Sequence, residues 1–191
     1  MPSLLKNRLA LSTVVTTLII LVVSVLLAGV VTYFAINVTS TRVQEENLHI
    51  TKQHVWHNST DGKSLATLMI INTGGRDIVI DKISVRGQEC GWNTSATKYV
   101  IYFKTQDAIT QDLAYAHNIN RTGSNTISID SIDREFDVAS GDVVIRSGFT
   151  MILYVAGPDS ISINDVGLTV SIEVFTAQAM YYREANVQAV S

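Results

Sequence analysis

The sequence has little cysteine, little proline and little charge. Its 191 residues include one cysteine, two prolines and only 16% charged side chains, against roughly 25% in a typical soluble domain. Because Cys90 is the single cysteine, no disulfide can form within the chain, and a zinc site built from several thiolates is excluded. The net charge of -3 comes without a basic cluster, which argues against a nucleic-acid partner.

Sequence motifs that usually accompany catalysis are also missing. There is no glycine-rich phosphate loop and no nucleophilic-serine elbow. Asp130, Asp133 and Glu135 cluster in "SIDSIDREFD", but the spacing and the glycine of a calcium loop are absent, so a solvated loop is expected. The sequence therefore predicts a protein that is not an enzyme and has no cofactor.

Histidines are the remaining candidates for a metal site. His54 and His57 are three residues apart and would share one side of a helix, but no third ligand stands at a suitable spacing. His49 and His117 have no evident partner in the sequence. We therefore expect exposed histidines and no bound metal.

A long apolar run near the N-terminus accounts for much of the low charge. No charged side chain occurs between Arg8 and Arg42. About 20 apolar residues are enough to cross a hydrocarbon layer of about 30 Å, so this run is long enough to span a membrane. A cleaved secretory signal peptide would have a shorter run, and a cut after Ala28 would place bulky Leu26 where a small residue is expected. A retained anchor fits the length. The positive-inside rule then leaves the N-terminus in the cytoplasm and everything after about Ser40 outside.

A third interpretation comes from the stretch "RLALSTVVTTLIILVVSVLLAGVVTYFAINVT". It resembles the start of archaeal type IV pilins and archaellins, which carry a class III signal peptide. The resemblance implies that a prepilin peptidase removes residues 1–10 by cutting between Ala10 and Leu11. It also implies that the hydrophobic helix stays on the subunit, first in the membrane and then in the core of a filament of identical subunits. In this chain Leu9 separates Arg8 from Ala10, whereas the family usually places the basic residue directly before the small one.

The hydrophobic helix is expected to extend beyond the apolar run. Ile36, Val43 and Ile50 are spaced by seven, as in a short heptad seam, so we predict an assembly helix over residues 11–56. Valine, isoleucine and threonine are poor helix formers in water, but lipid or a dry bundle enforces the helix because backbone groups have no other partner. The residues expected in the filament core are Val15, Leu18, Ile19, Leu21, Val22, Val25, Leu26, Gly29, Tyr33 and Ile36.

From about Lys63 the pattern changes to short runs rich in β-branched and aromatic residues, separated by turn signals. These runs are residues 64–72, 77–85, 98–103, 125–132, 142–147, 149–155, 160–163 and 166–175. They predict an antiparallel, immunoglobulin-like β-sandwich head over residues 57–191, and hence an α+β fold with a long N-terminal hydrophobic helix. The closing segment, residues 176–190, fits either a last strand or an exposed tail.

One part of the predicted head also resembles the pilin and archaellin family. The stretch "LATLMIINTGGRDIVIDKISVRG" is similar to the first hairpin of their heads. The pair Gly74 and Gly75 would supply the positive φ angles that a tight hairpin turn needs.

Four Asn-x-Ser/Thr sequons follow the start of the apolar run, at Asn37, Asn58, Asn93 and Asn120. Asn37 lies close to the membrane or inside the bundle in this interpretation. Asn58, Asn93 and Asn120 are therefore the candidate N-glycosylation sites, on the side expected to face outward.

Together these observations predict a structural subunit of an extracellular, type IV pilus-like filament on the cell surface, serving adhesion or attachment. Three alternatives stay open. They are a single-pass envelope protein with a ligand-binding β head, an archaellum subunit that serves motility, and an accessory minor pilin.

Overall fold

The computed structural model describes residues 8–43, 45–158 and 161–191. The chain divides into two compact units, Met1–Gln44 and Glu45–Ser191. The predicted fold class is confirmed: one long apolar helix is followed by a sandwich-like domain of mostly antiparallel strands. We call the second unit the head.

The described part of the first unit is one helix, α1 (Arg8–Val43), of 36 residues. At 1.5 Å per residue its length is about 54 Å. Five hydroxyl groups of the helix donate hydrogen bonds to backbone carbonyls three or four residues earlier; they belong to Thr16, Thr17, Ser24, Thr32 and Thr41. These side chains therefore need no water, and the helix is compatible with an apolar surrounding on every side.

The predicted extension of this helix to residue 56 is wrong. The helix ends at Val43, and strand β1 (Leu48–Asn58) begins five residues later, so Ile50 belongs to a strand and not to a heptad seam. Leu48 and Ile50 are buried and His49 between them is exposed, which is the alternation of a strand. An irregularity between Thr51 and His54 then interrupts this alternation and conceals it in the sequence.

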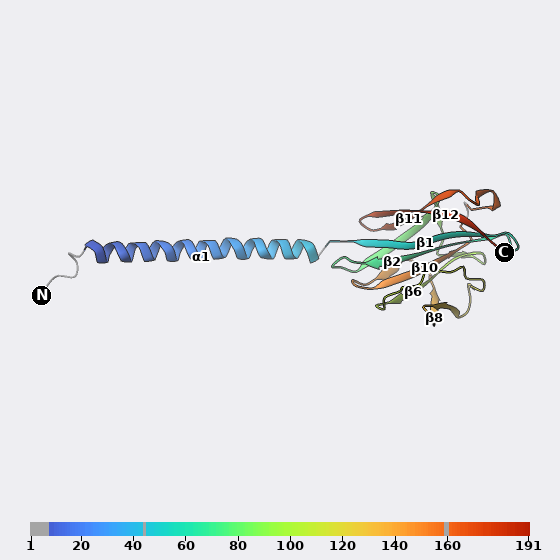
Figure 1. Ribbon diagram of the computed structural model, residues 1–191, viewed down its shortest axis with the longest axis horizontal. Helices are drawn as coiled ribbons and strands as arrows, with labels where there is room; N and C mark the ends of the chain where they lie inside the picture. Colours follow the sequence, from blue (N-terminus) through green and yellow to red (C-terminus); the bar gives the residue numbers. More distant parts are fainter. Residues whose placement is uncertain (1–7, 44, 159–160) are drawn as a thin grey trace. The chain divides into compact units, whose positions relative to one another are not determined.

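Within residues 45–158 and 161–191 the head contains twelve strands, whereas seven or eight were expected. After β1 they are β2 (Lys63–Asn72), β3 (Ile78–Val85), β4 (Gln88–Cys90), β5 (Asn93–Ser95), β6 (Lys98–Thr105), β7 (Asn125–Ile129), β8 (Ile132–Val138), β9 (Val143–Ile145), β10 (Thr150–Ala156), β11 (Thr169–Thr176) and β12 (Met180–Val190). Figure 1 shows β1, β2, β10 and β6 side by side. A strand was predicted over residues 160–163, but its described residues, 161–163, do not form one. The 3₁₀ turn η2 (Ile163–Asp165) begins at the last of them.

The strands form a central sheet and a second sheet that share β12. The central sheet runs β12-β1-β2-β10-β6-β8, with β7 paired to β8, and the second sheet joins β4, β3, β11 and β12, with β9 on β3. β12 pairs with β11 over its first part and, in parallel, with β1 over Val187 to Val190. The closing segment is therefore an interior strand that links the two sheets.

The predicted first hairpin is wrong in its pairing, although both of its strands exist. β2 lies in the central sheet between β1 and β10, and β3 lies in the second sheet beside β11. The turn between them crosses from one sheet to the other. Gly74 is needed there for close approach and not for a positive φ, because a Cβ atom would lie 2.6 Å from the carbonyl oxygen of Glu45.

The central sheet is buried on both faces, which makes the head a three-layer structure. Along β10, Met151, Leu153 and Val155 belong to a core shared with the second sheet. Ile152 and Tyr154 point the other way, into a second core covered by the β7–β8 hairpin and by residues 106–124. Burial on both faces explains why β10 reads as an uninterrupted apolar run.

Residues 106–124, which we call the strap, have no regular secondary structure but are tied to the sheet by specific bonds. The Tyr154 hydroxyl donates to the carbonyl of Ala114 (3.0 Å), and the Tyr99 hydroxyl donates to that of Ile119 (2.8 Å). Lys52 donates to the carbonyl of Thr110 (2.7 Å). Ile109 and Leu113 of the strap are buried in the second core. The bonds to side chains replace the backbone pairing that a strand would provide.

Candidate functional site

The surface of α1 is the first candidate site. The predicted core residues of the filament are all exposed on the single helix, from 46% for Val22 to 72% for Tyr33, and a Cβ on Gly29 would meet nothing within 4 Å. Residues Ser12–Thr41 form a stretch of 30 residues that is long and apolar enough to cross a membrane. The apolar side chains lie all round the helix, so no face of it suits water.

The predicted processing site lies at the beginning of this helix. Ala10 and Leu11 both belong to α1, which begins at Arg8. Residues 1–7 of the predicted signal peptide lie outside the described residues.

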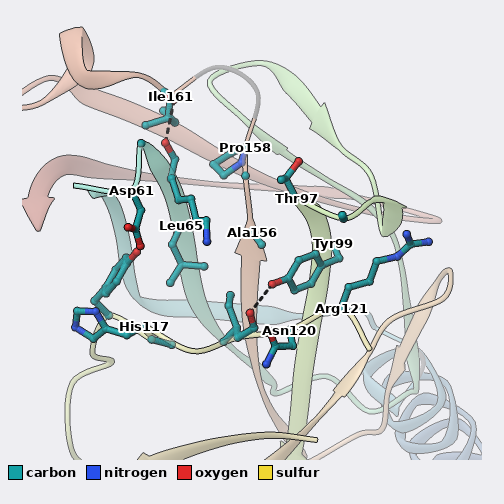
Figure 2. A pocket seen from close by; sticks show the side chains of 18 residues that line it. Asp61, Leu65, Thr97, Tyr99, His117, Asn120, Arg121, Ala156, Pro158 and Ile161 are labelled. Atoms are coloured by element: carbon teal, nitrogen blue, oxygen red, sulfur yellow. Dashed lines mark hydrogen bonds between the residues drawn. The ribbon is translucent and has the colours of Figure 1, made fainter. Parts of the chain in front are cut away.

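The head contains a cavity of about 580 Å³, which is the second candidate site (Figure 2). Four segments that are distant in the sequence line it: residues 61–65 at the β1–β2 turn, 96–99 before and in β6, 115–121 of the strap, and 156–158 together with Ile161 at and after the end of β10. The turn at residues 61–62 lies at the opposite end of β1 from Glu45, where the chain enters the head. No local motif marks these residues, so the cavity could not be predicted from the sequence.

The floor of the cavity is apolar and its rim is polar. Leu65, Tyr99, Ala156 and Ile161 are buried lining residues. In Figure 2 Asp61 and His117 lie on one side of the cavity, and Arg121 lies on the other. Burial raises the pKa of Tyr99, so its hydroxyl stays protonated and remains a donor to the Ile119 carbonyl.

The rim of the cavity carries charged and amide groups. The exposed side chains there are Asp61, Lys63, His117, Asn120 and Arg121. Arg121 donates through Nε to the side-chain oxygen of Asn93. Within the part of the chain that the structure describes, neither Lys63 nor Arg121 forms an ion pair.

The three candidate sequons in the head differ in access. Asn58 is only 4% exposed, and its side-chain oxygen accepts the backbone N–H groups of Thr60 (2.8 Å) and Asp61 (3.1 Å). Asn93 is half-buried and accepts the bond from Arg121, whereas Asn120 is exposed. Access therefore favours Asn120 as an acceptor. Asn37 lies on α1.

The histidines do not form the helical pair that the spacing suggested. His54 and His57 lie on β1, where residues three apart face opposite sides. His54 stacks on Trp56 and bonds to the Asp112 carboxylate (3.0 Å), and His57 bonds through Nδ1 to the Ser64 hydroxyl (3.0 Å). His49 is exposed, and His117 packs edge-on against Tyr115. Among residues 8–43, 45–158 and 161–191, no group of three or more His, Cys, Asp or Glu side chains could hold a metal ion.

The acidic cluster is also divided by the structure. Asp133 and Glu135 are exposed on β8. Asp130 lies in the β7–β8 turn, where its carboxylate accepts bonds from the Thr110 and Gln111 backbone N–H groups. The cluster is thus neither a calcium loop nor wholly a solvated loop, because Asp130 fastens the strap.

Comparisons with known proteins identify no family. No family model matches the chain, and no curated protein matches it. Among solved structures, the copper-bound PCuAC domain from PmoF2 is similar at 10% identity and a TM-score of 0.33, over 77% of this chain and 100% of that domain. The ligand-binding region of serine-glutamate repeat protein A (SgrA) of Enterococcus faecium is similar at 14% identity and a TM-score of 0.28, over 76% of this chain and 99% of that one.

Proposed function

We propose that this chain is the structural subunit of an extracellular filament of the type IV pilus kind, assembled through α1, which serves adhesion or surface attachment. The observation that carries the proposal is the length of the apolar helix. Ser12–Thr41 covers 30 residues without charge, or about 45 Å, whereas a hydrocarbon layer is about 30 Å thick. A plain anchor needs only about two thirds of this stretch. Burial against identical helices accounts for all of it.

The chemistry of the helix supports the same proposal. The hydroxyls of Thr16, Ser24 and Thr32 bond back to the backbone, so these three side chains can be buried in a dry bundle without an unsatisfied donor. In the membrane, before assembly, the same surface faces lipid. Exchange of lipid for other helices brings no hydrophobic gain, so close packing has to drive assembly. Contacts related by a rotation that does not close then produce an open filament.

Electron microscopy of material sheared from the cell surface tests the proposal, with Ile20→Lys as the test variant and Ile20→Leu as the matched control. Ile20 is exposed on α1, and a lysine there would place an unpaired ion inside the bundle. We expect filaments containing the chain from the wild type and from Ile20→Leu, and none from Ile20→Lys. The amount of each variant in the membrane fraction is measured in parallel, because a single lysine can also impair insertion.

Two results would contradict the proposal. One is sheared wild-type material that never contains the chain, and the other is normal filaments from Ile20→Lys. N-terminal sequencing of the mature protein gives a second criterion. A start at Leu11, or within a residue of it, supports a processed filament subunit, and an uncut N-terminus favours the single-pass envelope protein.

A further inference from the structure

We propose that the cavity of the head binds a sugar that carries a carboxylate group. The proposal depends on the head alone and not on filament assembly. It stands or falls on binding measurements, whereas the proposed function is tested by microscopy.

The form of the cavity suits a small polar ring. Its volume of about 580 Å³ lies within the range of roughly 300–1,000 Å³ found for small-molecule sites. The floor offers the apolar side chains of Leu65, Ala156 and Ile161, against which the C–H groups of a sugar ring can pack. The rim offers a carboxylate, an amide and cations. A sugar hydroxyl can donate a hydrogen bond to the carboxylate and accept hydrogen bonds from the amide and the cations.

The charges of the rim indicate an anionic substituent. Among the described lining residues, Lys63 and Arg121 contribute two cations against the carboxylate of Asp61, and neither cation forms an ion pair within that part of the chain. The bond from Arg121 Nε to Asn93 goes to a neutral amide, so this bond does not compensate the positive charge of the guanidinium. A guanidinium binds a carboxylate through paired hydrogen bonds, which makes Arg121 the residue expected to recognise the acid.

The walls of the cavity are held in place without a ligand. The Ser64 hydroxyl donates to the carbonyl of Ile161 (2.9 Å), which ties the β1–β2 side of the cavity to the segment after β10. Tyr99 ties β6 to the strap through the Ile119 carbonyl (2.8 Å). Gly157 has a φ of +60°, and a Cβ atom there would lie 2.3 Å from the carbonyl oxygen of Thr97. A preformed site loses less conformational entropy when it binds.

Titration of the detergent-solubilised full chain with glucuronic acid tests the proposal, and glucose serves as the matched neutral probe. Binding is followed by calorimetry and by saturation-transfer NMR. We expect glucuronic acid to bind at least tenfold more tightly than glucose. Arg121→Gln and Lys63→Gln should each weaken glucuronic acid binding by about tenfold, as expected for loss of a hydrogen bond to a charged group.

Two further variants locate the site. Ala96 is an exposed lining residue, and Ala96→Trp should abolish binding by filling the mouth of the cavity. Arg76 is an exposed arginine outside the lining, and Arg76→Gln should leave binding unchanged. Thermal unfolding of every variant shows whether the fold is intact, and the surface substitutions at Lys63 and Arg121 keep the test valid if Ala96→Trp does not fold.

Three results would overturn the proposal. Failure of glucuronic acid to bind refutes it directly, and equal affinity for glucose and glucuronic acid refutes the role of the carboxylate. Binding that survives Ala96→Trp in a folded protein places the site elsewhere.

Discussion

Asp130 shows, at the scale of single residues, how one side chain connects two parts of the head. Asp130 and Ser131 both have positive φ, +54° and +62°, and form the two-residue turn between the paired residues Ile129 and Ile132. The Asp130 carboxylate accepts bonds from the backbone N–H groups of Thr110 (2.9 Å) and Gln111 (2.7 Å). These bonds hold the pKa of Asp130 below its usual value, and the bond from the Thr110 N–H group has the largest effect.

The lowered pKa of Asp130 predicts a loss of stability in acid. A carboxyl whose pKa is lower in the folded state stabilises the fold above its unfolded pKa of about 3.9, and this contribution is lost as the pH falls through the folded value. We expect the free energy of unfolding to decrease below about pH 4, and Asp130→Asn to reduce this dependence on pH. Denaturant titrations of the full chain in detergent, followed by tryptophan fluorescence between pH 2.5 and 7, measure both effects.

Asp133→Asn is the matched control for this experiment. Asp133 is exposed on the neighbouring strand β8 and lies outside the turn. An equal reduction by both substitutions would contradict the role given to Asp130. Asp112, whose pKa is lowered chiefly by its bond to His54, contributes in the same direction, so the slope in Asp130→Asn does not fall to zero.

At the scale of secondary-structure elements, β10 is the strand on which the three layers depend. Leu153 packs into the core shared with the second sheet, and Ile152 packs into the core beneath the strap. Both are completely buried. The two residues therefore report on the two cores separately.

Truncation of β10 side chains tests whether both cores are equally well packed. We expect Leu153→Ala and Ile152→Ala each to lower the free energy of unfolding by about 2–5 kcal/mol, as measured by chemical denaturation. Val144→Ala, at an exposed position of β9, is the control and should cost much less. A cost below about 1 kcal/mol for Ile152→Ala alone would show that the strap does not close a true core.

Individual elements also show what could be predicted from the sequence and what could not. The helix α1 and strands such as β2, β3 and β10 were predicted correctly, because a long apolar run or a β-branched segment is a local pattern that can be recognised in the sequence. β1 was missed because its alternation is interrupted between Thr51 and His54. The pairing of β2 with β3 was predicted wrongly, because a turn sequence does not state whether the next strand stays in the same sheet.

The candidate sites follow the same distinction. The apolar surface of α1 is continuous in sequence, so it was recognised. The cavity was not, because residues as distant as Asp61 and Ile161 line it together only after the sheet has formed. The strap has weak strand and helix patterns, and only its tertiary contacts define its place.

At the scale of the whole molecule, the chain consists of two units with different chemistry. The head, Glu45–Ser191, has its own two cores. The first unit, Met1–Gln44, contains α1, which exposes apolar side chains throughout its described part. The stability of the head should therefore not depend on α1.

This division predicts that residues 45–191 fold when they are produced alone. We expect a soluble protein with the circular dichroism of a β-sheet and a cooperative thermal transition, because every strand keeps its partners. Far-ultraviolet circular dichroism and calorimetry provide the measurement. An unfolded or aggregated fragment would show that the head needs the helix.

The way in which the chain enters the head has a mechanical consequence. Asn47 accepts backbone bonds from Thr73 (3.0 Å) and Gly74 (3.1 Å), and the next strand, β1, lies between β2 and β12 in the interior of the sheet. A tensile load applied at Glu45 therefore acts first on these two backbone hydrogen bonds. It then acts on a strand that pairs with β2 along most of its length and also with β12 over Val55–Asn58, so extraction of β1 requires many bonds to be sheared together. An edge strand at this position could instead be peeled away one bond at a time.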